Sequence, residues 1–311
     1  MKHDVLPFQE FWTDCFSTIL YTIVLSSKEV EKKTVYNNDY TYQIVEEKLN
    51  DKRFHVIRPV ADLSMLKDCM LDIMKKVEVK ISKKDDIEQI IYYLDNNKLM
   101  VICVDMFDWI PDSLYYKKNH MIHFALVVGY DREDETLIIY DCGGTEGYHE
   151  YRMPFAKVAQ AMQRYKEECV VVDFQNINPE KCRVNKENLI SNAKRIMESI
   201  QKVFQHLDSI YEIDTFNMEL SVSFGRIICT HIFSMSERAL GNAKLLGENS
   251  VYYNEFESIH KQFHSLKIRV IKSYESRAIH SEIGEIKGCI QALLQKEYNL
   301  WKNIIEEDGN V

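Results

Sequence analysis

Three residues that can together perform nucleophilic catalysis lie in the first half of the chain: Cys15, His123 and Asp141. A cysteine is a strong nucleophile only as its thiolate, and a helix N-terminus or a neighbouring imidazolium favours that form. Thr13 or Asp14 can cap a helix that begins near Cys15. The sequence therefore predicts that this thiol stands at the start of a helix.

His123 and Asp141 stand at the ends of two apolar runs that are typical of neighbouring strands. His123 opens the run that ends at Tyr130, and Asp141 follows the run that begins at Leu137. The charged segment 131–136 joins the two runs as a hairpin turn. We therefore expect the two side chains to meet at one edge of a sheet, where Asp141 would orient the imidazole ring and stabilise its charged form.

Each of these residues also has an ordinary interpretation. A single cysteine is commonly a buried small hydrophobe, a strand-opening histidine a hydrogen-bonded core group, and a strand-ending aspartate a turn residue. His120 competes with His123 as the base, but its position three residues earlier predicts that it faces a loop. A metal site is a further alternative, with candidate ligands His120, His123, Cys142 and His149. These residues lack a compact ligand motif, so no metal is expected.

The composition suits a folded protein and excludes one class of partner. Of the 311 residues 46% are hydrophobic and 11% aromatic, which is typical of a globular chain rather than a disordered one. The formal charge of −9 lies in residues 1–180, which carry 22 basic and 31 acidic residues, whereas residues 181–311 carry 17 of each. Neither part has the basic excess that a nucleic-acid backbone requires, so we expect no nucleic-acid partner.

The cysteines and the apolar segments bear on the cellular compartment. The eight cysteines are scattered without C-x-x-C spacing, which argues against a zinc ribbon, a thioredoxin-like site and a disulfide framework. Residues 16–25 are an apolar run, but three hydroxyl residues interrupt it and no small-residue cleavage site follows. No stretch approaches the roughly 18 apolar residues that a membrane span needs. We therefore expect a soluble cytoplasmic protein with no membrane partner.

The periodicity of apolar residues predicts two domains, 1–178 and 179–311. In the first, mixed α/β domain it predicts helices at 8–25, 62–76, 85–94 and 153–165, and strands at 54–60, 77–81, 99–104, 123–130, 137–140 and 169–174. Residues 185–307 contain no proline and repeat with helical spacing. The second domain is therefore predicted to be a helical bundle, with helices near 190–204, 218–246, 252–280 and 283–305.

Several short motifs between residues 105 and 141 resemble one family. They are Asp105-x-x-Asp108-Trp109-x-Pro111, Tyr115-Tyr116, His120-x-x-His123-Phe124 and Gly129-Tyr130-Asp131, followed by Asp141. Together they resemble the N-terminal-domain family of the butirosin biosynthesis acyltransferase BtrH, over roughly residues 5–175. The resemblance implies an α+β papain-like cysteine-protease fold, related to the bacteriocin-leader peptidases, to which this chain adds a C-terminal α-helical domain.

The resemblance also implies roles for individual residues. Gln9 lies six residues before Cys15, the offset at which papain-like enzymes place a glutamine that donates to the developing oxyanion. The backbone N–H of the nucleophile is the second donor. Cys15 is then the nucleophile, His123 the base and Asp141 the group that orients it. The residue directly before the nucleophile is Asp14, whereas many relatives have a histidine there.

Amide formation in natural-product biosynthesis is the activity that the resemblance implies. An acyl group would move from the phosphopantetheine thioester of an acyl or peptidyl carrier protein to Cys15, and then to a small amine acceptor. No bound cofactor is expected, because a thioester is already activated and the chain has no Walker-type glycine loop. A cysteine peptidase with the same triad is the alternative, and a non-catalytic binding module is the third hypothesis.

Charge suggests where a carrier protein would dock. Carrier proteins are generally acidic, and the first part of this chain is acidic as well, so repulsion would keep a carrier away from most of that surface. The helical part offers basic positions instead, which are Lys261, Lys267, Arg269, Lys272 and Arg277. Their ordinary interpretation is a solvated helix face.

Overall fold

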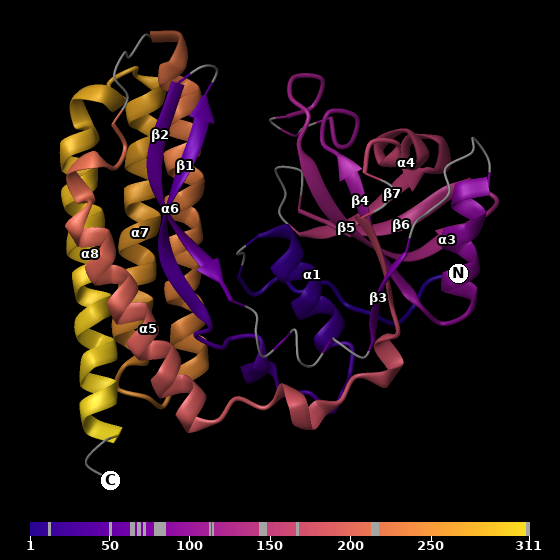
Figure 1. Ribbon diagram of the computed structural model, residues 1–311, viewed down its shortest axis with the longest axis horizontal. Coiled ribbons are helices and arrows are strands. Elements are labelled where there is room, and N and C mark those ends of the chain that lie inside the picture. Colours follow the sequence, from indigo (N-terminus) through magenta and orange to yellow (C-terminus); the bar gives the residue numbers. More distant parts are fainter. Residues whose placement is uncertain are drawn as a thin grey trace. The chain divides into compact units, whose positions relative to one another are not determined.

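The computed structural model describes residues 1–11, 14–49, 52–62, 66, 70, 73–77, 85–111, 113, 115–142, 148–165, 168–212 and 218–308. The chain has a mixed α+β architecture with two antiparallel sheets and a C-terminal helical region (Figure 1). It divides into two compact units. The sheet unit comprises Met1–Val35 and Ser64–Arg183, and the bundle unit comprises Tyr36–Leu63 and Val184–Val311.

A six-stranded antiparallel sheet forms the centre of the sheet unit, in the order β3–β8–β4–β5–β6–β7. Its strands are β3 (Met74–Val77), β4 (Leu99–Asp105), β5 (Ile122–Asp131), β6 (Thr136–Asp141), β7 (His149–Pro154) and β8 (Cys169–Val172). Strands β4, β5 and β6 are buried over most of their length, as their apolar sequences predict. Because β5 lies between β4 and β6, residues at its start are close to the last residues of both neighbours.

Helices cover both faces of this sheet. They are α1 (Cys15–Val24), α3 (Asp85–Asp95) and α4 (Phe155–Met162). In α1, the ring of Phe16 lies 5.3 Å from that of Phe124 in β5. Side chains alternate along a strand, so Phe124 and Ala125 point to opposite faces. Ala125 belongs to the core that includes residues of α3 and α4, which places α1 on the other face.

The start of α1 is fixed by a side-chain cap. Asp14 has extended backbone geometry, and its carboxylate accepts a hydrogen bond from the backbone N–H of Ser17 at 2.9 Å. This is the capping predicted for Asp14. The helix is shorter than the predicted span 8–25, because Phe8 and Phe11 are buried through aromatic contacts with each other and with Tyr21 rather than on a helical face.

The bundle unit contains four long helices and a hairpin. The helices are α5 (Lys186–Gln205), α6 (Met218–Leu246), α7 (Tyr253–Glu275) and α8 (Ile279–Asp308), and the hairpin strands are β1 (Tyr40–Leu49) and β2 (Lys52–Ala61). The hairpin packs against α5 and α6 (Figure 1), and the rings of Phe54 and Phe224 lie 4.9 Å apart. The units thus differ from the contiguous domains 1–178 and 179–311, since residues 36–63 join the helices.

A buried carboxylate ties the hairpin to the helices. Glu297 of α8 is fully buried and accepts hydrogen bonds from the hydroxyls of Tyr40 and Tyr42 in β1. The amide of Asn242 in α6 and the indole of Trp301 in α8 also donate to it. Burial raises the pKa of Glu297, and these donated hydrogen bonds oppose the rise. The network therefore fixes the position of β1 on the bundle.

Two sequence predictions fall partly outside the described residues. Only Leu66, Met70 and the end of the predicted helix 62–76 are described, and strand β3 begins at Met74. Of the predicted strand 77–81, only Val77 is described.

Among the cysteines, Cys182 is disulfide-bonded, and the free thiols are Cys15, Cys103, Cys142, Cys169, Cys229 and Cys289. In the described part of the chain, no helix is long and apolar enough to cross a membrane.

Replacing Glu297 with glutamine should destabilise the bundle unit by about 2 kcal/mol, because the new amide N–H₂ faces hydroxyl and indole donors and leaves one buried donor unpaired. Urea unfolding followed by circular dichroism measures the change. Glu307→Gln, an exposed position on the same helix, is the matched control. Equal free energies of unfolding for the two variants would show that the buried network contributes nothing specific.

Candidate active site

The central strands bring an imidazole and a carboxylate together at one end of the six-stranded sheet. His123 lies at the start of β5 and Asp141 is the last residue of β6. Nε2 of His123 lies 2.7 Å from Oδ1 of Asp141, and the two side chains are 11% and 0% exposed. This is the contact predicted from the two strand ends. We call these two residues the His123–Asp141 pair.

The second oxygen of Asp141 has its own donor. Oδ2 accepts a hydrogen bond from the indole N–H of Trp109, which is fully buried in the core shared with α3 and α4. With Oδ2 held by the indole, Oδ1 is directed at the imidazole. Sequence reasoning assigned no role to Trp109. The available signal was its position in the Asp108-Trp109-x-Pro111 motif ahead of the two histidines.

Cys15 stands at the first position of α1 and is partly exposed. The capping carboxylate of Asp14 is engaged by the first turn of the helix, since it accepts from both the N–H and the hydroxyl of Ser17, at 2.9 and 2.6 Å. The thiol of Cys15 lies near enough to the ring of His123 to contribute to its raised pKa. Because Asp141 occupies Nε2, Nδ1 is the ring nitrogen that remains for the thiol.

The electrostatics favour a charged His123. Burial disfavours the imidazolium, but the charge and hydrogen bond of Asp141, together with the interaction with Cys15, outweigh it and raise the pKa of His123 from 6.5 to about 10. At neutral pH the ring therefore carries a positive charge. A cation beside a thiol at a helix N-terminus is the environment that favours a thiolate.

Gln9 lies beside the same end of the sheet. It is exposed, and its amide nitrogen donates a hydrogen bond to the carbonyl oxygen of Tyr148 at 3.0 Å. Tyr148 directly precedes His149, which pairs with Asp141 in the β6–β7 ladder. A glutamine amide has two N–H donors, so the contact with Tyr148 orients the group while using one of them.

The structure brings together only some of the residues considered as metal ligands. His123, Asp141 and Cys142 have potential ligand atoms within 4.8 Å of one another, the one such cluster in the described part of the chain. Its imidazole Nε2 and both carboxylate oxygens are, however, engaged by direct hydrogen bonds. These hydrogen bonds occupy the atoms that an ion would need as ligands.

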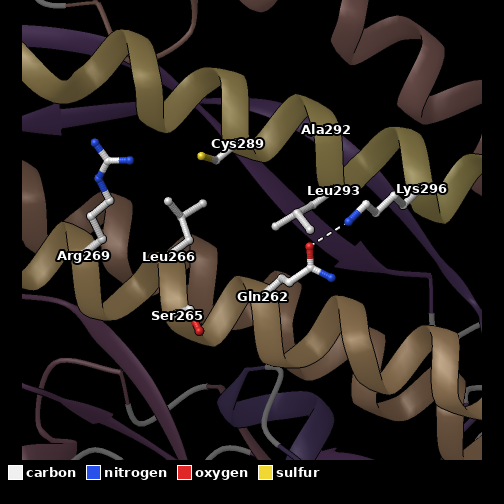
Figure 2. Close-up of a pocket in the computed structure, with 8 residues that line it drawn as sticks. All are labelled: Gln262, Ser265, Leu266, Arg269, Cys289, Ala292, Leu293 and Lys296. Carbon is white, nitrogen blue, oxygen red and sulfur yellow. Dashed lines mark hydrogen bonds between the residues drawn. The ribbon is translucent and has the colours of Figure 1, made fainter.

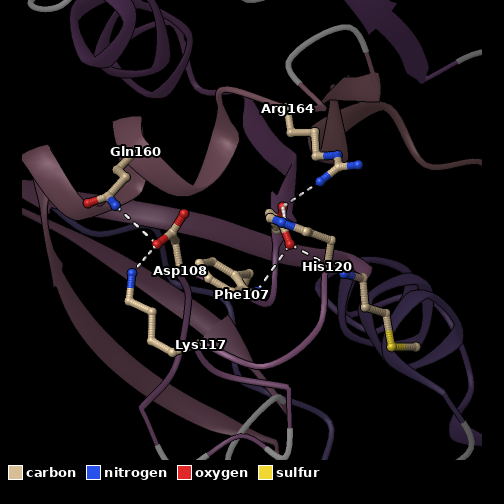
Figure 3. A network of polar contacts seen from close by, with 8 residues as sticks. Phe107, Asp108, Lys117, His120, Gln160 and Arg164 are labelled. Atoms are coloured by element: carbon tan, nitrogen blue, oxygen red, sulfur yellow. Dashed lines mark hydrogen bonds and ion pairs between the residues drawn. The ribbon is translucent and has the colours of Figure 1, made fainter. Parts of the chain in front are cut away.

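The other two residues of the metal alternative lie elsewhere. His149 stacks on Tyr151, with ring centroids 4.2 Å apart. Nδ1 of His120 lies 2.6 Å from Oδ2 of Asp105, and the side chain of His120 is 49% exposed (Figure 3). His120 therefore belongs to a second polar network. That network also holds Phe107 and Arg164.

A pocket of about 340 Å³ lies between α7 and α8 of the bundle unit (Figure 2). Leu266 and Leu293 line it, and Lys296 donates a hydrogen bond to Gln262 at its rim. None of the described residues that line it is a histidine or a carboxylate. The pocket therefore lacks a base for nucleophilic chemistry and is not the candidate active site.

The basic positions considered for carrier docking are partly engaged within the bundle unit. Arg269 contacts Glu282 and Glu285 of α8, and Lys261 contacts Glu257 one helical turn away. These pairs reduce the positive field that the helices present to an acidic partner.

Comparison of the chain with protein-family models and with curated protein sequences finds no match. Support for a function therefore comes from the geometry of the site and from the resemblance of the motifs.

Asp141→Asn should lower the pKa of His123 well below its value of about 10. An amide carries no charge, so the burial of the ring would no longer be outweighed to the same degree. NMR titration of the ring resonances of His123 measures the shift. Asp105→Asn, which alters the other histidine's partner, should leave His123 close to about 10. An unchanged titration in Asp141→Asn would contradict this account of the charged ring.

Proposed function

We propose that the chain is an amide-forming acyltransferase with a papain-like catalytic unit, in which Cys15 carries the acyl group. The observation that carries this proposal is the buried His123–Asp141 pair beside a thiol at the start of α1. A helix-start cysteine on one face of an antiparallel sheet, with its base and orienting acid on adjacent strands, is the arrangement of papain-like enzymes. The motifs within residues 105–141 support the same family.

In the first half-reaction the thiolate of Cys15 attacks the thioester carbonyl of the donor. The oxyanion that develops is stabilised by the side-chain amide of Gln9 and the backbone N–H of Cys15. The imidazolium of His123 gives its proton to the leaving thiol. The products are acyl-Cys15, a free thiol and a neutral His123.

In the second half-reaction a neutral amine attacks the carbonyl of acyl-Cys15. A C–N bond forms, the C–S bond breaks, and His123 accepts a proton from the nitrogen. Cys15 leaves as the thiolate and His123 is again charged. The resting thiolate–imidazolium pair is thereby restored, so no nucleotide or redox cofactor is consumed.

The proposed donor is a phosphopantetheine thioester on an acyl or peptidyl carrier protein, and the acceptor is a small amine, in the cytoplasm. A cysteine peptidase is the alternative, because it uses the same acyl-enzyme and the same triad with water as the final acceptor. A non-catalytic module is disfavoured, since a scaffold has no need of Gln9, Cys15, His123 and Asp141 together. Only the fate of acyl-Cys15 separates the first two.

Incubation with an acylated carrier protein should add the mass of the acyl group to the wild-type chain, at Cys15. Intact-mass and peptide-mapping spectrometry test this. Cys15→Ala should show no adduct and no turnover. Cys142→Ala is the strictest control, because that thiol also lies near His123 and Asp141 yet should be dispensable. An adduct that maps to Cys142 would move the nucleophile to that residue.

Discharge of acyl-Cys15 should be slow in buffer and fast with a suitable primary amine, which should yield amide. His123 must be neutral to accept a proton, so the rate per neutral amine should rise with pH through its ionisation. Acylation removes the contribution of Cys15 to the raised pKa of His123, so the midpoint of this increase in rate should lie at a pH below about 10. The amide-to-acid ratio across diamines and amino sugars is the measurement. Rapid discharge to acid with every amine, with cleavage of peptides, would favour the peptidase.

A further inference from the structure

A second histidine–aspartate pair stands at the same end of the sheet. Two histidines lie at the start of strand β5 or just before it, and each contacts a carboxylate from a different neighbouring strand. His123 pairs with Asp141 from β6, and His120 pairs with Asp105, the last residue of β4. The ladder aligns Val104 with His123, so the two pairs occupy adjacent positions along the sheet end.

Asp105, like Asp141, is buried and has a partner for each carboxylate oxygen. Its side chain is 5% exposed, and Oδ1 accepts hydrogen bonds from the backbone N–H groups of Phe107 and Met121 at 3.1 and 3.3 Å. Oδ2 contacts His120 at 2.6 Å and Arg164 at 3.9 Å (Figure 3). Burial acts to raise the pKa of Asp105, but these donors lower it below its usual value. The carboxylate is therefore ionised at neutral pH.

His120 is oriented but open to solvent. Its ring stacks on Phe107 with centroids 4.5 Å apart and planes inclined by 23°. Because Asp105 holds Nδ1, Nε2 is the nitrogen available to a ligand on this half-exposed ring. His120 thus presents an oriented ring nitrogen to solvent or to a ligand.

The aspartate of this second pair faces the side of the sheet that α1 covers. Cys103 and Asp105 are two residues apart in β4, so their side chains point to the same face of the sheet. Phe16, the residue after Cys15, packs on Phe124 with ring centroids 5.3 Å apart, and the ladder aligns Phe124 with Cys103. The face of β4 that carries Asp105 is therefore the face on which the start of α1 lies.

Amide formation from an alkylamine needs a second proton acceptor. An alkylammonium has a pKa of about 10, as lysine does, so the acceptor reaches the site protonated at neutral pH. Two protons must leave its nitrogen before the amide is complete. In the proposed function His123 takes one of them as the C–N bond forms.

We propose that His120, supported by Asp105, binds the ammonium group of the acceptor and takes its first proton at Nε2. This inference rests on the proposed acyltransferase function. The N–H bond breaks and leaves a neutral amine, which attacks acyl-Cys15 while its second proton passes to His123 and the sulfur leaves as thiolate. The proton taken up by His120 passes on to water, to which its half-exposed side chain is open.

The test compares two amines in single-turnover discharge of acyl-Cys15 at pH 7. A simple alkylamine is protonated at this pH, whereas trifluoroethylamine is already neutral and needs no first deprotonation. His120→Gln should slow discharge by the alkylamine by about 10²-fold, the usual contribution of one general base. It should leave acylation of Cys15 and discharge by trifluoroethylamine within about twofold of wild type. His149→Gln, which changes another histidine at this end of the sheet, should affect neither amine.

A structural role for His120 predicts a different result. Equal slowing with both amines, or slower acylation, would mean that His120 only supports the loop after β4, and would overturn the inference. An unchanged alkylamine rate would overturn it as well. If His120→Gln does not fold, His120→Ala with added imidazole replaces it, and restoration of the alkylamine rate is the expected result. Absence of acyl-Cys15 in the wild type would instead defeat the proposed function itself.

Discussion

The carboxylate of Asp141 is fully buried, and this constrains how its end of the sheet is built. An unpaired charge in such a position destabilises a fold by several kcal/mol, or about 3–5 kcal/mol when one partner of a buried pair is removed. Both oxygens therefore need donors, and His123 and Trp109 supply them. One donor lies at the start of β5 and the other in the segment after β4. Because Asp141 needs a donor for each oxygen, it positions the imidazole of His123 and holds the β4–β5 connection against the core through Trp109.

How far the site follows from the sequence depends on how local each contact is. The His123–Asp141 pair was predictable because a hairpin joins its two strands, so the ends of both apolar runs meet by necessity. The cap by Asp14 was predictable because it depends only on residues 14–17, which follow one another along the chain. The hydrogen bond from Trp109 was not, since an indole in a loop can be buried against many partners and no periodicity specifies which.

The hairpin formed by β1 and β2 shows the same limit at a larger scale. Only its second strand was predicted, at 54–60, and a strand pattern does not state what covers its apolar face. In the structure Tyr40 and Tyr42 reach Glu297, about 255 residues away along the chain. The buried carboxylate needs several donors, and these hydroxyls supply two of them. Residues 36–63 therefore belong to the same unit as the helices and not to that of the sheet.

The two histidines at the start of β5 and just before it differ more in burial than in the kind of partner they have. Both are bound to ionised or buried carboxylates, yet the side chain of His123 is 11% exposed and that of His120 is 49% exposed. The enclosed ring of His123 lies between Asp141 and the thiol of Cys15, and its raised pKa keeps it charged, which fits the role proposed for it of protonating a leaving group. In the proposed reaction, acylation of Cys15 would remove the thiol from that balance, so the charge on His123 would depend on whether Cys15 carries an acyl group. The ring of His120 is open to solvent instead, which in the proposed reaction suits it to meet the incoming amine before that amine reaches acyl-Cys15.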